Sequence, residues 1–548
     1  TIVAHVGTRI DADSGCVRAL WEIKDGKLVR QLAAYDYDDQ GDLRQAQDEN
    51  GAAWHYQYDR HLITRYTDRT GRGMNLAYDT SIDSGLHARA IREWADDGSD
   101  DTRLEWDKNI RLTYVLDALG HETRYYYDIA GYTYRIVYPD GLEEWLFRDD
   151  AKNVVRHIHT DGSSEHHRYD DHGNLLTHTR ADGSQVHFEY DAQHRVTGIR
   201  DAEGGIWRRD YNAQGHLVEE TDPRGNKTQY AYDKAGRPVE VIDAKGGVTK
   251  LVYTPDGQLA GYTDCSGHSS QWEYDDRKRL VKSIDAAGNV TRYRYTPVSS
   301  ETLAQAHSEG TDIGNHPGQL EAVIHPDGSQ EQLRHDAEGR LLAYIDALQR
   351  VTAYRYTVGG LIAKRTDALG HSLQYQWDAL GRLTALQNEN DSVYRFQYDP
   401  VGRLLREQGF DGKTTEYRYD GASGVLAETV EAGVTTRLDF DSMGRLVQRR
   451  AAAPGQAEQV ETFAYNANGQ LAEAKNEHAR LQWFYDDAGN LVREHQHYHG
   501  PFHPDKRTAV WRHHHDELNQ RIGTTRPDGH RIDWLTYGAG HVHGLLLD

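Results

Sequence analysis

The sequence is poor in cysteine: its 548 residues include two, Cys16 and Cys265. This excludes a disulfide framework of the kind that stabilises secreted domains. The low cysteine content is therefore typical of a chain that folds in a reducing compartment.

Basic residues and long apolar runs are also scarce. The chain has 63 Lys plus Arg against 86 Asp plus Glu, a net charge of −23. Because nucleic acids and anionic membrane surfaces are bound through clustered basic residues, this balance argues against both as partners. No apolar run approaches the roughly 20 residues that span a bilayer, and the segment TIVAHVGTRIDADSG has none of the features of a signal peptide. Since the sequence starts at Thr1 and not Met, we expect a piece of a longer polypeptide.

A short motif, Y-D-x-x-G-x-L, recurs along the chain. Its aromatic position falls at Tyr211, Tyr232, Tyr253, Tyr274 and Tyr295, a step of about 21 residues. Such a fixed period indicates one supersecondary unit stacked many times. The motif residues that we assign a structural role in the clearest copies are Tyr37, Asp38, Gly41, Tyr169, Asp170, Gly173, Tyr232, Asp233, Gly236, Trp377, Asp378, Gly381, Tyr398, Asp399, Gly402, Tyr485, Asp486 and Gly489.

Each repeat is predicted to be a β-hairpin. Segments such as TQYAYD (228 to 233) and LQYQWD (373 to 378) alternate with a period of two, which places the aromatic residues on one sheet face and Thr, Gln, Arg and Lys on the other. The aspartate starts a turn and the glycine accepts a positive φ. Roughly forty short strands exceed what one flat sheet can hold, so the sequence predicts an all-β spiral of hairpins that wraps into a hollow shell.

The predicted shell is one continuous domain over residues 35–548, with residues 1–34 as a lead-in. Intervals longer than one period predict insertions at about 80–103, 298–318 and 493–512. The net acidity suggests that part of the shell's inner surface is negative and suits a basic cargo.

Catalytic signatures are missing or unconvincing. The sequence contains no H-E-x-x-H, G-x-S-x-G or C-x-x-C motif, and its Gly412-Lys413-Thr414 lacks the upstream glycine of a phosphate-binding loop. Most aspartates occupy the same turn position of the repeat, where capping explains them. We therefore predict no enzymatic activity, no catalytic residue and no cofactor for this segment.

A histidine-rich segment is the main local anomaly, with seven histidines between residues 495 and 515. On a strand, His495, His497 and His499 would project from one face and could bind zinc, copper or nickel. They are weak metal candidates, because a polar, solvated insertion explains the same residues. A second hypothesis is that the histidines become protonated together near pH 6 and act as a pH sensor.

The repeats resemble the YD repeats of the Rhs (rearrangement hotspot) family, which are similar to those of the B and C components of Tc toxins and of teneurins. The resemblance runs from about Tyr35 to about Tyr537, and residues 526–548 resemble the stretch before the C-terminal core of bacterial Rhs effectors. The resemblance implies a hollow cocoon around a C-terminal toxin domain. The resemblance also implies a C-terminal D-P-x-G-L core whose aspartates act in autoproteolytic release of the toxin. That core has no match before Asp548, and no PAAR-like region is present.

The sequence thus predicts an encapsulating shell for its own C-terminal toxin, held in the bacterial cytoplasm before export and delivered into a target cell, with type VI secretion as the expected route. A missing N-terminal region would contact the secretion spike or a chaperone. An extracellular adhesion or carbohydrate-binding protein is the alternative, since aromatic ladders can stack on sugar rings. An enzyme on a repetitive β scaffold would need a carboxylate pair that breaks the repeat register, and a teneurin-like ectodomain would bring disulfides.

Overall fold

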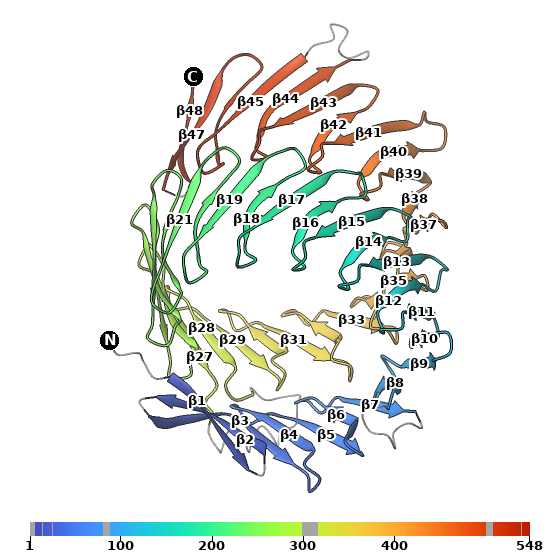
Figure 1. Ribbon diagram of the computed structural model, residues 1–548, viewed down its shortest axis with the longest axis vertical. Coiled ribbons are helices and arrows are strands. Elements are labelled where there is room, and N and C mark those ends of the chain that lie inside the picture. Colours follow the sequence, from blue (N-terminus) through green and yellow to red (C-terminus); the bar gives the residue numbers. More distant parts are fainter. Residues whose placement is uncertain are drawn as a thin grey trace. The chain divides into compact units, whose positions relative to one another are not determined.

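The computed structural model describes residues 6–13, 15–24, 26–79, 88–298, 316–499, 508–538 and 540–548, the first of these ranges by its backbone alone. These residues form 48 strands and no helix (Figure 1). Every pairing described joins two strands that follow one another in the sequence, and every one is antiparallel, as in β21 with β22. The predicted all-β hairpin fold is confirmed. The described part of the chain contains no helix long and apolar enough to cross a membrane.

The chain divides into two compact units, whereas the sequence predicted one continuous domain. The first unit comprises residues 1–125, 253–260 and 270–412, and the second comprises residues 126–252, 261–269 and 413–548. Each unit thus combines hairpins from distant parts of the chain.

The first eleven strands, the last of which ends just beyond the first segment of the first unit, are β1 (Val6–Asp13), β2 (Cys16–Lys24), β3 (Lys27–Tyr37), β4 (Leu43–Asp48), β5 (Ala53–Asp59), β6 (Leu62–Thr67), β7 (Gly73–Tyr78), β8 (Ala90–Ala95), β9 (Thr102–Asp107), β10 (Leu112–Leu116) and β11 (Glu122–Tyr127). The next twelve are β12 (Thr133–Val137), β13 (Glu143–Arg148), β14 (Val154–Ile158), β15 (Ser164–Tyr169), β16 (Leu175–Thr179), β17 (Gln185–Tyr190), β18 (Val196–Arg200), β19 (Ile206–Tyr211), β20 (Leu217–Thr221), β21 (Lys227–Tyr232), β22 (Pro238–Ile242) and β23 (Val248–Tyr253).

The strands that follow are β24 (Leu259–Thr263), β25 (Ser269–Tyr274), β26 (Leu280–Ile284), β27 (Val290–Tyr295), β28 (Leu320–Ile324), β29 (Gln330–His335), β30 (Leu341–Ile345), β31 (Val351–Tyr356), β32 (Ile362–Thr366), β33 (Ser372–Trp377), β34 (Leu383–Gln387), β35 (Val393–Tyr398) and β36 (Leu404–Gln408). The last twelve are β37 (Thr414–Tyr419), β38 (Leu426–Glu431), β39 (Val434–Phe440), β40 (Leu446–Ala452), β41 (Gln459–Tyr465), β42 (Leu471–Lys475), β43 (Ala479–Tyr485), β44 (Leu491–Tyr498), β45 (Thr508–His515), β46 (Arg521–Thr525), β47 (Arg531–Tyr537) and β48 (His541–Leu547).

The turn between β21 and β22 shows how the motif closes a hairpin. The Oδ1 atom of Asp233 accepts hydrogen bonds from the backbone N–H groups of Ala235 and Arg237, at 2.8 and 3.0 Å. Gly236 has φ = 79°, in the left-handed region that glycine adopts without steric cost. The return strand ends in a second turn of the same form, in which Asp243 caps the N–H groups of Lys245 and Gly247.

Side chains alternate between two faces of each hairpin. In β21, Lys227, Gln229 and Ala231 are exposed, while the intervening Thr228, Tyr230 and Tyr232 are half-buried. We call the face of Tyr230 and Tyr232 the aromatic face. The predicted placement of threonine on the opposite face is wrong: residues two apart share a face, and Thr228 lies two positions before Tyr230.

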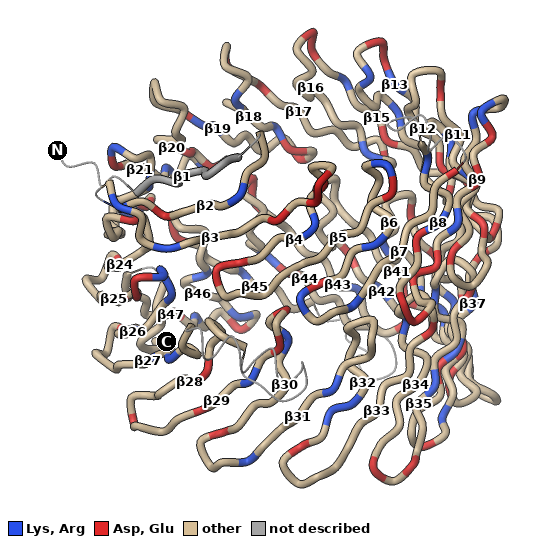
Figure 2. Tube along the Cα trace, turned by 90° about the horizontal axis from the view of Figure 1, so that it is seen from below, with Lys and Arg blue, Asp and Glu red and all other residues tan. Residues whose placement is uncertain are grey.

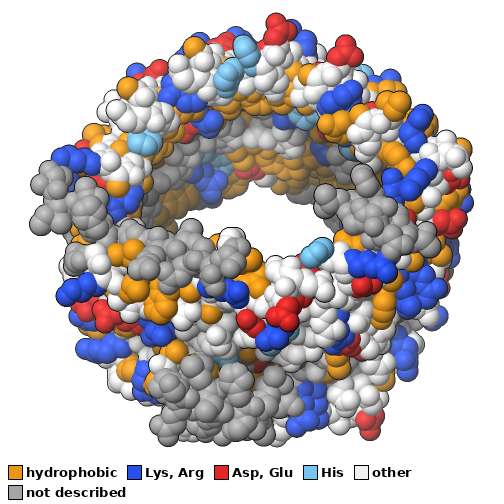
Figure 3. All heavy atoms as spheres, turned by 60° about the horizontal axis from the view of Figure 1, so that its bottom comes forward, with side chains coloured by type: hydrophobic (Ala, Val, Ile, Leu, Met, Phe, Trp, Pro, Cys, Tyr) orange, Lys and Arg blue, Asp and Glu red, His pale blue; other side chains and the backbone are white. Residues whose placement is uncertain are grey.

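The described residues contain little solid core. The buried hydrophobic residues are mostly alanines, together with Leu112 and Ile345. Acidic, basic and hydrophobic side chains are interspersed on the face drawn in Figure 3. The sheet is therefore thin. Hydrogen bonds and half-buried side chains hold it together, and few of its apolar residues are fully buried.

Within each unit, turns from one stretch of hairpins contact turns from a distant stretch. In the first unit, Glu338 accepts hydrogen bonds from the backbone N–H and the guanidinium of Arg69. In the second, Arg224 donates to the backbone carbonyl of Asp516 at 2.9 Å. We call each of these two rows of contacts a turn seam. Charged residues of both signs recur along the hairpins, including at their turns (Figure 2).

The predicted insertions were drawn too wide. Residues 90–95 form β8, and residues 493–498 and 508–512 belong to β44 and β45, which are longer than most strands of the repeat. The described part of the lead-in, residues 6–13, 15–24 and 26–34, is likewise built from strands, since β2 pairs with β3 and β3 with β4. Of the predicted insertions, residues 80–87, 299–315 and 500–507 lie outside the described residues.

Candidate functional site

The repeat tyrosine joins each hairpin to the one before it. The hydroxyl of Tyr232 donates a hydrogen bond of 2.7 Å to the backbone carbonyl of Leu217, and Tyr398 bonds Leu383 at 2.8 Å. Trp377 makes the equivalent bond through Nε1, to Ile362 at 2.8 Å. The same bond is made by Tyr78, Tyr169, Tyr190, Tyr211, Tyr274, Tyr295 and Tyr356.

An arginine directly after the turn residue of positive φ makes a second link. Arg382 bonds Asp378 of its own turn through Nε at 2.7 Å, and its guanidinium lies 5.0 Å from the ring centroid of Tyr398 in the next repeat. Arg195, Arg279 and Arg340 repeat this arrangement. The aspartate, arginine and tyrosine therefore connect consecutive hairpins, a link that the sequence analysis missed.

The turn carboxylates are held in their charged form. The side chain and backbone of Arg195 lower the pKa of Asp191, and the backbone N–H and guanidinium of Arg237 lower the pKa of Asp233. At Asp378, burial raises the pKa, but hydrogen bonds from Arg382 and Leu380, together with the charge of Arg382, outweigh it and the net direction is down. These carboxylates thus stabilise turns and are poor proton donors at neutral pH.

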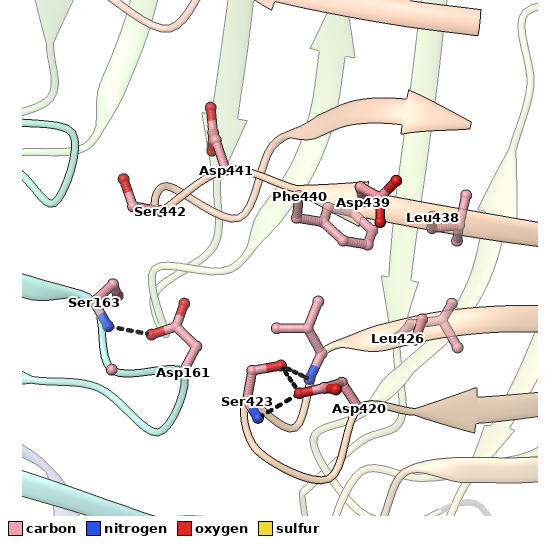
Figure 4. A pocket seen from close by; sticks show the side chains of 13 residues that line it. Asp161, Ser163, Asp420, Ser423, Leu426, Leu438, Asp439, Phe440, Asp441 and Ser442 are labelled. Carbon is pink, nitrogen blue, oxygen red and sulfur yellow. Dashed lines mark hydrogen bonds between the residues drawn. The ribbon is translucent and has the colours of Figure 1, made fainter. Parts of the chain in front are cut away.

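A recess of about 540 Å³ lies against three turns of the second unit (Figure 4). Four aspartates line it, and hydrogen bonds engage each one. Asp161 accepts from the N–H of Ser163, and Asp420 accepts from Ser423. Asp439 bonds Arg450, and Asp441 bonds Arg445. This arrangement accounts for the acids by turn capping and ion pairing.

The predicted metal candidates do not converge on one point. His495 and His497 share a face of β44, with ring centroids 5.8 Å apart. Both ring nitrogens of His497 are within hydrogen-bonding distance of polar atoms, Thr508 Oγ1 at 2.8 Å and Gln482 Oε1 at 3.3 Å. His499 follows the end of β44, where its backbone N–H donates a hydrogen bond of 2.8 Å to the backbone carbonyl of His478. Among the described residues, these three do not form a group of ligand atoms close enough for one ion.

The structure brings together a different set, which the sequence analysis missed. Glu165 and His167 of β15 and His178 of β16 place one ligand atom each within 4.8 Å of the others. Burial lowers the pKa of His167, helped by the neighbouring His178, so its ring is neutral near pH 7. The available signal was the alternation in SEHHRY (164 to 169), which puts Glu165 and His167 on one face.

Comparison with known proteins identifies the repeat. The family described as RHS Repeat matches residues 169–206, 211–248, 253–290, 335–372, 359–393 and 377–414. A curated relative, "Toxin protein Tse5" of Pseudomonas aeruginosa, is 36% identical over 108 residues, which are 20% of this chain and 8% of that protein.

Solved structures of the same fold cover nearly the whole chain. The TcdB2-TccC3-Cdc42 structure has a TM-score of 0.65 at 11% identity over 98% of this chain and 40% of that one. The TcdB2-TccC3 structure has a TM-score of 0.62 at 13% identity, covering 97% and 38%. The Photorhabdus luminescens Tc holotoxin pore has a TM-score of 0.55 at 13% identity, covering 97% and 34%. The chain thus spans less than half the length of these relatives. The chain therefore contains RHS repeats over the matched residues and has the β-hairpin fold of the TcdB2-TccC3 structures.

Proposed function

We propose that this chain is the wall of a shell that encloses a toxin polypeptide and keeps it from acting until delivery. The observation that carries the proposal is the likeness to TcdB2-TccC3 over 97% of the chain. The RHS repeats and the 36% identity to the toxin protein Tse5 support the same assignment.

The physical character of the wall suits containment. Consecutive hairpins with little buried core give a sheet that presents side chains on both faces. Containment depends on a large continuous surface, and the turn aspartates of the recess in Figure 4 are used for capping and ion pairs. In this proposal the wall itself has no enzymatic activity.

The cargo is proposed to be the toxin domain that follows the wall in the complete polypeptide. The protein would be held in the bacterial cytoplasm and then delivered into a target cell by type VI secretion or a related machine. The spike or chaperone of that machine would bind a region outside this chain.

Protease protection of the cargo tests the proposal. The complete polypeptide is digested with a non-specific protease at low concentration, and survival of the C-terminal domain is followed by mass spectrometry. We expect the domain to be cleaved only when denaturant opens the wall. A companion digestion uses the same domain expressed without the wall.

Two results separate the outcomes. Slow cleavage inside the wall and fast cleavage of the isolated domain support enclosure. Equal cleavage rates would overturn it, as would electron microscopy that shows a filled particle with no lumen.

A further inference from the structure

Three potential metal ligands meet on the aromatic face of one hairpin in the second unit. Glu165 and His167 lie two residues apart on β15, and His167 faces His178 of β16 in the strand register. One ligand atom from each side chain lies within 4.8 Å of the other two. The three groups are therefore neighbours through strand pairing, which fixes their positions.

The contacts among these three side chains leave one ring nitrogen unused, and this nitrogen could bind a metal. The Nε2 atom of His178 lies 3.2 Å from Oε2 of Glu165. The rings of His167 and His178 stack with centroids 4.7 Å apart and planes 13° apart. The Nδ1 atom of His167 is shielded from solvent and has no hydrogen-bond partner among the described residues. An unsatisfied buried polar atom is costly, and the contact between Glu165 and His178 does not satisfy this nitrogen.

The preceding hairpin provides an internal comparison. There, His157 of β14 lies 3.4 Å from Glu144 of β13, the same carboxylate–imidazole pair one repeat earlier. At the position equivalent to His167, that hairpin has Leu146. The pair therefore recurs as part of the repeat, whereas the third donor occurs in only the later of these two hairpins.

We propose that Glu165, His167 and His178 bind one divalent transition-metal ion of the zinc class. Two imidazoles and one carboxylate form a donor set that Zn²⁺ accepts in tetrahedral geometry, with the fourth position open to water or another ligand. Ligand atoms around such an ion lie about 3.3 Å apart, so small side-chain rotations bring the three into place.

The site is accessible and is anchored on regular strands. The side chains of Glu165 and His178 are each 27% exposed, so an ion can reach them from solvent. The metal would replace the direct contact between Glu165 and His178 and would pin β15 to β16. This role is independent of whether the wall encloses a toxin.

The test is a titration of the purified chain with Zn²⁺ against a chromophoric chelator. The wild type is expected to take up one tight equivalent, with weaker binding at other histidines. His167→Leu reproduces the residue of the preceding hairpin and is expected to lower the affinity of the tight site about tenfold or more. His178→Ala is expected to do the same, whereas His166→Ala, an exposed histidine on the opposite face of β15, leaves the tight equivalent unchanged.

A gain-of-site variant makes the test two-sided. Leu146→His adds the third donor beside Glu144 and His157 and is expected to create a second tight equivalent. Circular dichroism without metal checks that each variant folds, and hydrogen exchange checks that Zn²⁺ protects β15 and β16 in the wild type. Equal zinc affinity in the wild type and a folded His167→Leu variant overturns the proposal, as does loss of the tight equivalent in His166→Ala.

Discussion

At the residue scale, the repeat tyrosine has two roles that one side chain combines. Its ring is half-buried on the aromatic face, and its hydroxyl satisfies a backbone carbonyl of the preceding hairpin. The sequence predicted the ring's role, because alternation reveals which residues share a face. It did not predict the hydroxyl bond to a residue 15 positions earlier, as in Tyr232 with Leu217, because that bond depends on how neighbouring hairpins are offset.

Replacing Tyr232 by Phe tests the hydroxyl bond. The change removes the 2.7 Å hydrogen bond from the hydroxyl to the carbonyl of Leu217, so we expect a local loss of about 1 kcal/mol. Hydrogen exchange of β20 and β21 should accelerate about fivefold. Tyr134, which is 38% exposed, is the control, and Tyr134→Phe should leave exchange unchanged. Equal effects at both positions would contradict this role.

Gln349 occupies the turn position that glycine holds in most repeats, with φ = 63°. A left-handed conformation costs a non-glycine residue about 1–2 kcal/mol. Replacement by glycine removes this cost, but part of the gain is lost because glycine has more conformational freedom in the unfolded chain. We expect Gln349→Gly to stabilise the turn by about 0.5–1 kcal/mol, measured as a higher denaturant midpoint. Its neighbour Leu348, which lies outside the left-handed region and is 72% exposed, is the control. Leu348→Gly is expected to lower the denaturant midpoint.

At the scale of the element, the sequence predicted hairpins but misjudged their lengths. The motif marks one point per repeat, so an interval with extra residues does not reveal whether a loop or the strands have grown. Between Tyr485 and His515 part of the excess lengthens the strands, since β44 and β45 have eight residues each. The turn seams were also beyond prediction, because Arg224 and Asp516 belong to turns that only the folded unit brings together.

Mutation of Arg224 tests the turn seam of the second unit. Its guanidinium donates to the carbonyl of Asp516 at 2.9 Å and to Asn519 Oδ1 at 3.0 Å. Arg224→Ala removes both bonds, and we expect a local loss of about 1–2 kcal/mol, seen as faster hydrogen exchange at residues 222–226 and 516–520. Arg208, 62% exposed and 3.9 Å from Glu189, is the matched control, because an exposed ion pair contributes little. If Arg208→Ala had the same effect, the seam would not be the cause.

At the scale of the whole molecule, a half-buried strand histidine and the turn aspartates make stability depend on pH in two steps. Burial lowers the pKa of His515 below 6.5, so the unfolded chain binds more protons than the folded chain when the pH drops below 6.5. The free energy of unfolding therefore decreases as the pH falls below this value. A hydrogen bond from Asn289 lowers the pKa of Asp285 below 3.8, and its contribution is present above 3.8 and lost as the pH falls through the folded value. We expect thermal midpoints that decline gently below pH 6.5 and steeply below 3.8. A midpoint that rises between pH 6 and 3 would contradict both assignments.

The thin core predicts that damage stays local. Leu112 is one of few fully buried side chains, with 2% of its surface exposed, and Leu112→Ala is expected to cost about 2–3 kcal/mol. In a globular domain with one core such a loss lowers the stability of every element, but in a stack of hairpins each hairpin contacts mainly the hairpins before and after it. Hydrogen exchange should therefore accelerate in β9 and β10 and stay unchanged in β43 and β44. Uniform acceleration across the chain would mean that the repeats unfold as a single cooperative body.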